Sequence, residues 1–148
     1  MDVSTSGQRR LKAVRGATSV TRDEPAAIVD ATEELLRTML ERNEVDPDDV
    51  VSIVFTATPD LVSEFPAPAA RRLGLSDVPL LCAAEIAVEG ALPRCVRILL
   101  HIETARERSS LRHVYLREAK ALRSDLDDRT GEDQVKGHAA PNPRGQVE

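Results

Sequence analysis

The side chains best suited to chemistry in this sequence lie at the ends of apolar stretches or interrupt them. Arg97 interrupts the apolar stretch Cys95–Leu100, and Arg15 lies directly before Gly16. Arginine binds carboxylates through a planar fork of N–H donors and keeps its charge at physiological pH. Further candidates are Arg71, Cys82, Glu85, Tyr115 and Arg123. Such a set suits the binding of a small dianion, but it does not by itself identify a reaction.

Arg97 is the most informative of these residues. Alternation along a strand puts Arg97 on the same face as Cys95 and Leu99, with the other apolar residues on the opposite face. If both faces are covered, the guanidinium must find a polar or anionic partner, because an unpaired buried charge is strongly destabilising. An edge strand with a solvated arginine, or a structural salt bridge with Glu85, explains the pattern equally well.

Composition and motifs argue against several classes of function. The net charge of −5 disfavours general nucleic-acid binding, because attraction to phosphates requires a basic excess. The sequence has no Walker loop, no dinucleotide-binding glycine motif and no G-x-S-x-G motif. His101 and His113 lack metal-ligand spacing with either cysteine, so we expect no metal site. Tyr115 also fits an ordinary half-buried strand position.

The two cysteines, Cys82 and Cys95, do not form a C-x-x-C pair. The sequence opens with a polar segment, and no stretch approaches the roughly 20 apolar residues of a membrane span. We therefore expect a cytoplasmic protein with free thiols, in which Cys82 is either a packing residue or part of a site.

Two helices are expected to support these side chains. Residues 23–25 have the composition of a helix start, with a capping acid and an early proline. Apolar residues then recur at helical spacing to about Asn43, which predicts a helix with one apolar stripe that packs on a sheet. A shorter helix is predicted from residues 65–68 to Gly74.

The strands are predicted from apolar and β-branched stretches at residues 11–20, 50–58, 78–83 and 96–102. Gly16 is expected to break the first stretch, so that Arg15 is presented rather than packed. Residues 111–122 are expected to form the last strand, although their second half also fits a helix.

The predicted order is β-α-β-α-β-β-β, an α+β fold with a mixed sheet and helices on one face. We expect one domain at residues 11–126, between a disordered lead at 1–10 and a disordered tail at 127–148. A single sheet with one long helix buries little surface, so oligomerisation is a natural way to cover the remaining sheet.

Six short motifs occur in order between about Leu11 and Leu126. They are Val14-Arg15-Gly16-Ala17-Thr18, Thr56-Ala57-Thr58-Pro59-Asp60-Leu61, Phe65-Pro66-Ala67, Val78-Pro79-Leu80-Leu81-Cys82 with Glu85, Cys95-Val96-Arg97, and Arg112-His113-Val114-Tyr115-Leu116. In this order and spacing they resemble the monofunctional AroH-type chorismate mutases. The resemblance covers nearly all of the predicted domain.

The resemblance implies a trimeric pseudo-α/β-barrel with active sites in clefts between neighbouring subunits. It also implies the conversion of chorismate to prephenate, a Claisen rearrangement in phenylalanine and tyrosine biosynthesis. This reaction is pericyclic, so no cofactor is expected. Catalysis then depends on holding the reactive conformer and on charges directed at the polarised transition state.

The resemblance also implies roles for individual residues. Arg97 would meet the ether oxygen, on which negative charge grows as the C–O bond breaks. Arg15 would bind the side-chain carboxylate region, and Tyr115 would donate a hydrogen bond to a carboxylate. Glu85 and the neighbourhood of Cys82 would engage the ring hydroxyl. The other residues implied to line the site are Phe65, Ala67, Arg71, Leu81, Ala83, Ala84, Leu122 and Arg123, with Arg71 and Arg123 near the mouth.

One departure from the family pattern is Pro68, which stands where relatives often carry a lysine near the entrance. Electrostatic capture of substrate is then weaker, or falls to Arg71 and Arg72. The alternatives are a Rid-type trimeric imine deaminase, a small-anion-binding homologue, and an idle regulatory homologue. The Cys82/Glu85 pair speaks against the Rid type, and the joint presence of the polar residues speaks against an idle homologue.

Overall fold

The computed structural model describes residues 7–122 of the 148-residue chain. Residues 1–6 of the predicted lead, the predicted tail at 127–148 and the candidate Arg123 lie outside the described residues. The strands are β1 (Arg10–Ser19), β2 (Val50–Ala57), β3 (Leu80–Ala84), β4 (Cys95–Thr104) and β5 (Val114–Tyr115). The helices are α1 (Pro25–Arg42), α2 (Pro68–Arg72) and the short 3-10 helices η2 (Pro47–Asp49), η3 (Arg108–Ser110) and η4 (Arg117–Leu122).

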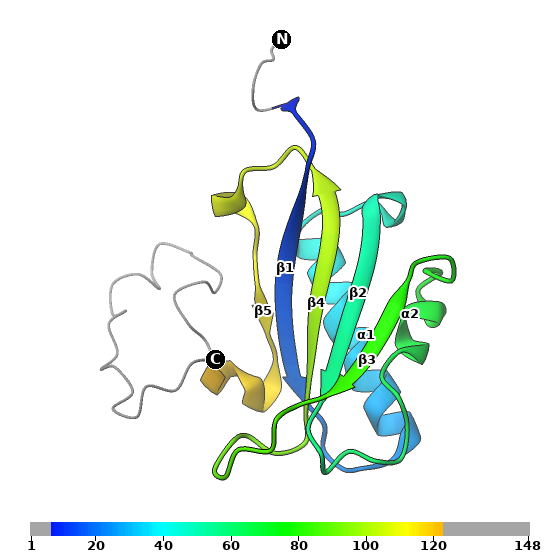
Figure 1. The fold of residues 1–148 in the computed structure, drawn as a ribbon, viewed down its shortest axis with the longest axis vertical. Coiled ribbons are helices and arrows are strands. Elements are labelled where there is room, and N and C mark those ends of the chain that lie inside the picture. Colours follow the sequence, from blue (N-terminus) through cyan, green and yellow to red (C-terminus); the bar gives the residue numbers. More distant parts are fainter. Residues whose placement is uncertain (1–6, 123–148) are drawn as a thin grey trace, which may run out of the picture.

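The five strands form one mixed sheet in the order β3-β2-β4-β1-β5. Central β4 pairs antiparallel with β1 and β2, whereas β3 joins β2 and β5 joins β1 in parallel. Figure 1 shows α1 and α2 on the same side of this sheet. The predicted order of elements and the α+β class are therefore confirmed.

The core lies between the sheet and α1, where alternate strand residues meet the apolar stripe of the helix. Burying an aliphatic side chain of this size stabilises a fold by about 1.5–3 kcal/mol. The most buried members are Val14, Leu35, Leu36, Met39, Ile53, Phe55, Ile98, Leu100 and Ile102, each at most 1% exposed.

Gly16 does not break β1, and that prediction was wrong: the strand runs continuously from Arg10 to Ser19. A Cβ at position 16 would overlap the sulfur of Met39 and lie 3.1 Å from Cδ1 of Leu35. Glycine is therefore needed for the close approach of α1 to the sheet. Arg15 is a half-buried residue in mid-strand rather than one presented at a strand end.

The sequence predicted that an acid caps the start of α1, but the Asp23 side chain does not do so. The N-cap residue is Glu24, which makes no side-chain capping bond. Oδ1 of Asp23 instead accepts hydrogen bonds from the Ser63 hydroxyl (2.8 Å) and from the backbone N–H groups of Ser63 (3.1 Å) and Val62 (3.0 Å). The bond from the Ser63 hydroxyl is the main cause that lowers the pKa of the Asp23 carboxyl. Asp23 thus ties the loop before α2 to the start of α1.

The predicted last strand is much shorter than expected, because only Val114–Tyr115 pair with β1 before the chain turns into η4. The helical alternative for the second half of this segment is closer to the structure. The Arg117 backbone has a φ of 54°, which is incompatible with continued strand pairing.

The face of the sheet opposite α1 and α2 is open over most of its area within residues 7–122. Only one end is covered, by η4 and the segment before β4. Leu11, Leu81 and Leu99 on this face are 60%, 63% and 38% exposed. An apolar surface of this kind usually marks an interaction site. We call it the open face below.

None of the helices within residues 7–122 has both the length and the apolar character needed to cross a membrane.

Candidate active site

An ion pair between Arg97 and Glu85 lies at the polar centre of the open face. Arg97 on β4 points away from the helices, as the alternation predicted. Its Nε atom lies 3.1 Å from Oε2 of Glu85, and the two side chains are 35% and 14% exposed. Oγ1 of Thr56 donates a hydrogen bond to the same carboxylate oxygen at 2.6 Å. The pairing of Arg97 with Glu85, left open by the sequence, is present.

Glu85 reaches Arg97 because of the path that the chain takes after β3. The Glu85 N–H donates to the carbonyl of Ala57, the last residue of β2, at 2.9 Å. The following segment then crosses the end of the sheet toward β4 (Figure 1). Glu85 lies at the start of this crossing, and its side chain extends from there to Arg97 on the central strand.

Arg15 and Tyr115 lie beside the ion pair on the same face. The strand register aligns Thr56, Arg97, Ala17 and Tyr115 in one row across β2, β4, β1 and β5. Arg15 lies two residues from Ala17 along β1, diagonally across from Arg97. Diagonal neighbours are about 7–8 Å apart, a span that long side chains bridge. The structure thus brings three of the predicted residues together with Glu85.

Cys95 lies below this row in a small apolar cluster with Ala17 and Ala119, against which Tyr115 and Leu122 pack. Burial, together with the nearby charge of Glu85, raises the pKa of the Cys95 thiol to about 11. The thiol therefore stays neutral at pH 7. Because η4 packs here, Leu122 and Tyr115 pack against the same cluster, and the resemblance implies that Leu122 forms apolar wall of the site.

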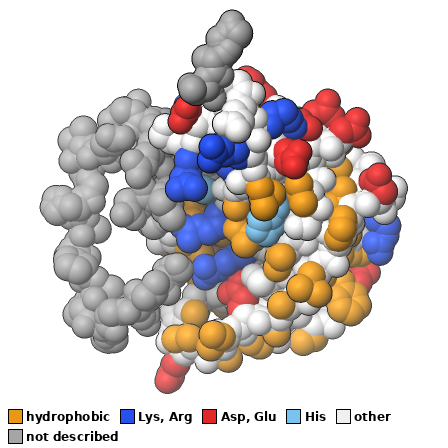
Figure 2. All heavy atoms as spheres, turned by 45° about the horizontal axis from the view of Figure 1, so that its top comes forward, with side chains coloured by type: hydrophobic (Ala, Val, Ile, Leu, Met, Phe, Trp, Pro, Cys, Tyr) orange, Lys and Arg blue, Asp and Glu red, His pale blue; other side chains and the backbone are white. Residues whose placement is uncertain are grey.

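Arg15 also lines a groove of about 670 Å³ on the open face. Figure 2 shows Lys and Arg side chains gathered next to a histidine that hydrophobic side chains border. The lining residues are Leu11, Lys12, Ala13, Arg15, Leu99, His101, Arg108, Ser109, Leu111 and His113, which include no acid. The charged side chains that line this groove are basic, so the groove favours anions.

Cys82 lies away from the ion pair. It is the register partner of Phe55, whose side chain is buried under the helices, and it packs against the core beside Ala67. Burial raises the pKa of its thiol, and a backbone hydrogen bond with Ala67 opposes this effect. Within one chain, Cys82 and Glu85 therefore face opposite sides of the sheet, although the resemblance implies that they share a site.

The remaining predicted residues lie near the α2 and β3 edge of the sheet. Phe65 is 68% exposed in the loop before α2, Ala67 is half-buried, and Arg71 is exposed on α2. Leu81, Ala83 and Ala84 are exposed on β3. The candidate residues thus form two groups. The Arg97 group is Arg15, Glu85, Arg97, Tyr115 and Leu122, and the α2 group is Phe65, Ala67, Arg71 and Cys82 with the exposed part of β3.

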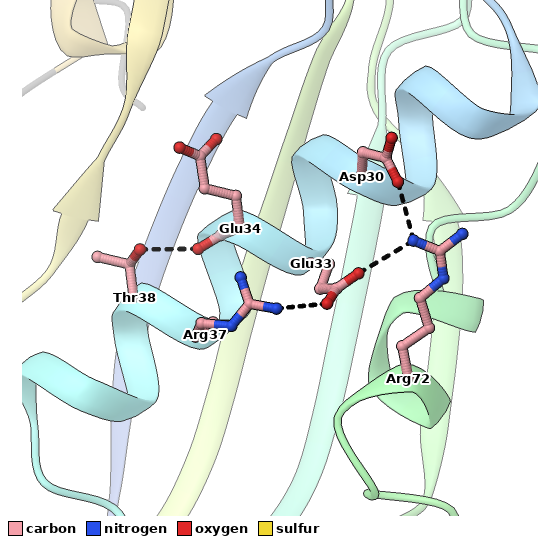
Figure 3. Close-up of polar contacts among 6 residues, drawn as sticks. All are labelled: Asp30, Glu33, Glu34, Arg37, Thr38 and Arg72. Atoms are coloured by element: carbon pink, nitrogen blue, oxygen red, sulfur yellow. Dashed lines mark hydrogen bonds and ion pairs between the residues drawn. The ribbon is translucent and has the colours of Figure 1, made fainter.

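Arg72 is not available to replace the entrance lysine. Its guanidinium donates to Asp30 (2.8 Å) and Glu33 (3.0 Å) of α1, and Arg37 pairs with Glu33 from the other side (Figure 3). The bonds with Asp30 and Glu33 raise the pKa of Arg72. Arg72 therefore docks α2 onto α1, and Arg71 is the arginine of this helix that remains a candidate for the entrance.

Thr56 and His113 contact the Arg97 group, but the sequence assigned them no role. Nδ1 of His113 accepts a hydrogen bond from the Arg15 N–H at 3.0 Å. Both residues belong to the quoted motifs, and strand alternation puts Thr56 on the face of Arg97. The contact of His113 depends on a β1–β5 register that no local pattern reveals.

Within residues 7–122, the structure shows no group of three or more His, Cys, Asp or Glu side chains that could hold a metal ion.

Comparisons with known proteins agree with this geometry. The chain matches the family "Chorismate mutase type I" over residues 11–126. It is 48% identical over 118 residues to the chorismate mutase AroH of Thermus thermophilus, covering 79% of this chain and 97% of that one. It is 41% identical over 117 residues to the chorismate mutase AroH of Bacillus subtilis, covering 78% of this chain and 92% of that one.

A solved structure of a chorismate mutase from Clostridium thermocellum superposes with a TM-score of 0.73 at 43% identity, covering 74% of this chain and 98% of that one. None of these matches supports the imine-deaminase alternative. The family match and the two relatives, together with the α+β fold, show that this chain belongs to the type I chorismate mutase family.

Proposed function

We propose that this protein catalyses the intramolecular Claisen rearrangement of chorismate to prephenate, in the biosynthesis of phenylalanine and tyrosine. The observation that carries the proposal is the half-buried Arg97–Glu85 ion pair on the open face of a type I chorismate mutase chain. The reaction breaks a C–O bond and forms a C–C bond within one molecule. It needs a fixed geometry and a fixed counter-charge rather than an acid, a base or a nucleophile.

Arg97 is the counter-charge for the ether oxygen in this proposal. Glu85 and Thr56 hold the guanidinium in place before substrate arrives, since Glu85 engages Nε and Thr56 fixes Glu85. The terminal nitrogens of the guanidinium then meet the ether oxygen and a carboxylate. A preorganised donor stabilises the transition state more than the bound substrate, because the negative charge develops only as the bond breaks.

The other residues bind and shape the substrate. Arg15 binds the side-chain carboxylate region, Tyr115 donates to a carboxylate, and Glu85 accepts from the ring hydroxyl. Leu122 forms apolar wall next to Tyr115, supported by its packing in the Cys95 cluster. The other proposed contacts are Phe65, Ala67, Arg71, Leu81, Cys82, Ala83, Ala84 and Arg123.

We further propose that the active protein is a homotrimer whose sites lie between subunits. Cys82 lies on the helix side of the sheet, whereas Arg97 lies on the open face, so one small substrate does not contact both residues of one chain. A neighbouring copy that covers the exposed Leu11, Leu81 and Leu99 would bring its α2 group to the Arg97 group.

We also propose one catalytic domain at residues 11–126, the range of the family match. A cytoplasmic location is proposed as well, because Cys82 and Cys95 are free thiols.

The activity is tested by the ultraviolet absorbance of chorismate with purified protein. The expected result is a loss of chorismate far faster than the uncatalysed rearrangement, with prephenate as product. The value of kcat should be nearly the same in D₂O and in H₂O, because the chemical step transfers no proton. Disappearance of chorismate at the uncatalysed rate would refute the proposed function.

The intersubunit site is tested by mixing two inactive or impaired variants, Arg97→Ala and Arg71→Ala. In mixed trimers some sites receive both intact residues, so activity should exceed the sum of the separate variants. Light scattering should give three times the mass of one chain. A mixture no more active than its components, or a monomer with full activity, would refute the intersubunit arrangement.

A further inference from the structure

The two oxygen atoms of the Glu85 carboxylate have different surroundings. Oε2 accepts a hydrogen bond from Oγ1 of Thr56 at 2.6 Å, and Nε of Arg97 lies 3.1 Å from the same oxygen. The contact with Arg97 is an ion pair rather than a hydrogen bond, because Nε has no hydrogen-bond partner within residues 7–122. In this part of the chain, the bond from Thr56 is therefore the hydrogen bond that fixes the carboxylate, and Oε1 receives none.

The sheet places Thr56 for this bond. Thr56 is the register partner of Arg97 across β2 and β4, and both side chains lie on the open face. Such partners have Cβ atoms about 4.5–5.5 Å apart, so the Thr56 hydroxyl reaches a group that is bound at Arg97. The two substituents on Cβ restrict χ1 of a threonine. The donor is therefore held in place, and the carboxylate does not turn away without losing a strong charge-assisted bond.

The other oxygen, Oε1, is an acceptor that a ligand can use. The Glu85 side chain is 14% exposed, so its carboxylate has limited access to water. A largely buried carboxylate oxygen is stabilised by a hydrogen-bond donor, which a bound ligand can supply. A carboxylate of the ligand at the same place would instead be repelled by the like charge. Oε1 therefore favours a ligand that presents an O–H or N–H group.

Chorismate, the substrate proposed above, meets this requirement in one orientation. At neutral pH it carries two carboxylates, an ether oxygen and one ring hydroxyl, so the hydroxyl is its single hydrogen-bond donor. Binding with the hydroxyl at Oε1 forms a charge-assisted bond, whereas binding with a carboxylate there brings two negative charges together. The position of Oε1 thus selects how the ring of the substrate lies.

We propose, on the basis of the function above, that Thr56 is a positioning residue that directs Oε1 of Glu85 at the ring hydroxyl and so determines the preference for substrates that carry this hydroxyl. Thr56 does not touch the substrate. It acts through Glu85, because its bond holds Oε2 beside Arg97 and leaves Oε1 for the substrate. Without Thr56, the carboxylate keeps its charge and its attraction to Arg97 but loses its fixed direction.

The test compares chorismate with its deoxy analogue, in which hydrogen replaces the ring hydroxyl. Thr56→Val keeps the branched shape of the side chain and removes the donor, whereas Thr56→Ser keeps the donor and removes the methyl group. Ser52→Ala is the matched control, because Ser52 also lies on the open face of β2, with Oγ 3.3 Å from Nδ1 of its register partner His101.

We measure kcat and KM of each full-length enzyme for both substrates. The inhibition constant of the analogue against chorismate is measured as well, so that the comparison does not depend on turnover of the analogue. Circular dichroism and light scattering compare the fold and the assembly of the variants with those of the wild type.

The wild type should favour chorismate over the analogue in kcat/KM by at least about tenfold, the effect of one hydrogen bond to a charged group. Thr56→Val should lower kcat/KM for chorismate about tenfold and that for the analogue by a much smaller factor. The loss should lie mainly in KM, because the hydroxyl donates in the bound substrate as well as in the transition state. Thr56→Ser should keep most of the preference, and Ser52→Ala should keep the activity and the preference.

Wild-type turnover of chorismate establishes the function separately, so failure of the Thr56 proposal is distinguishable from failure of the function. Equal losses for the two substrates in Thr56→Val would overturn the proposal, because Thr56 would then act on Arg97 or on the fold alone. So would a wild-type preference in Thr56→Val, or a preference that disappears in Ser52→Ala. If Thr56→Val does not assemble, Thr56→Ala carries the same expectations.

Discussion

The two faces of the sheet are built from alternate residues of the same strands, yet they obey different physical demands. On the face toward α1 the residues of β4 are Ile98, Leu100 and Ile102, each at most 1% exposed. On the open face the same strand presents Arg97, Leu99 and His101. The covered face is optimised for packing, whereas the open face carries the charges of the site and the apolar surface proposed for the partner subunit.

Substitutions on one face of a strand should therefore change mainly stability, and substitutions on its other face should change mainly activity. A change on the covered face alters the contact with α1 and hence the free energy of unfolding. A change on the open face alters the site with a smaller effect on the core. The following experiments test this separation, beginning with the largest effect.

Arg97→Ala should lower kcat by about 10²–10³-fold, because it removes the fixed donor at the ether oxygen. The matched control is Ile98→Val, the adjacent residue on the covered face. It should lower the free energy of unfolding by about 0.5–1.5 kcal/mol and leave kcat of the folded enzyme unchanged. Steady-state kinetics and urea unfolding make the comparison. An Arg97→Ala trimer with kcat within a small factor of wild type would contradict the role of Arg97.

Cys95 should make the folded protein sensitive to alkaline pH. Its pKa is raised to about 11 by burial, whereas an unfolded thiol ionises at about 8.5. The stability due to the buried neutral thiol is therefore fully present below pH 8.5 and is lost as pH rises to 11, by roughly 3 kcal/mol. Urea unfolding of wild type and Cys95→Ala isolates this contribution, since other groups titrate in both proteins. Parallel pH profiles for the two proteins would be the contrary result.

Gly16→Ala should destabilise the fold by about 1–3 kcal/mol, because the added methyl group overpacks the contact between β1 and α1. Gly7→Ala is the control, since a Cβ at that position meets no atom within 4 Å. Thermal unfolding monitored by circular dichroism measures both. An unchanged melting temperature for Gly16→Ala would show that Met39 rearranges without cost.

Arg72→Ala should have the smallest effect, less than about 1 kcal/mol in unfolding, because its ion pairs with Asp30 and Glu33 are exposed. The effect should shrink further in 1 M salt, which screens such pairs. We expect kcat/KM to be unchanged, as Arg72 docks α2 rather than capturing substrate. A loss of kcat/KM that depends on salt would instead favour the original expectation that Arg72 attracts the dianion.

Much of this molecule follows from local pattern. The helical spacing of apolar residues predicted α1, and β-branched stretches predicted β2 and β4 within a few residues. Strand alternation alone placed Arg97 and Ile98 on opposite faces of the sheet. The ordered motifs indicated the family. These inferences succeed because strand and helix periodicities are properties of neighbouring residues.

Other features were decided only by contacts between distant parts of the chain. Asp23 occupies a position typical of a helix cap, but its carboxylate accepts a hydrogen bond from Ser63. Gly16 was expected to break a strand, but it instead leaves room for the side chain of Met39. The sequence by itself determined the order of the elements, the face of Arg97 and the family. Only the tertiary structure decided that Glu85 reaches Arg97, that Cys82 faces away from it, and that His113 binds Arg15. The reason is that a residue pattern sets which face a side chain occupies, whereas strand register and crossover paths set which side chain it meets.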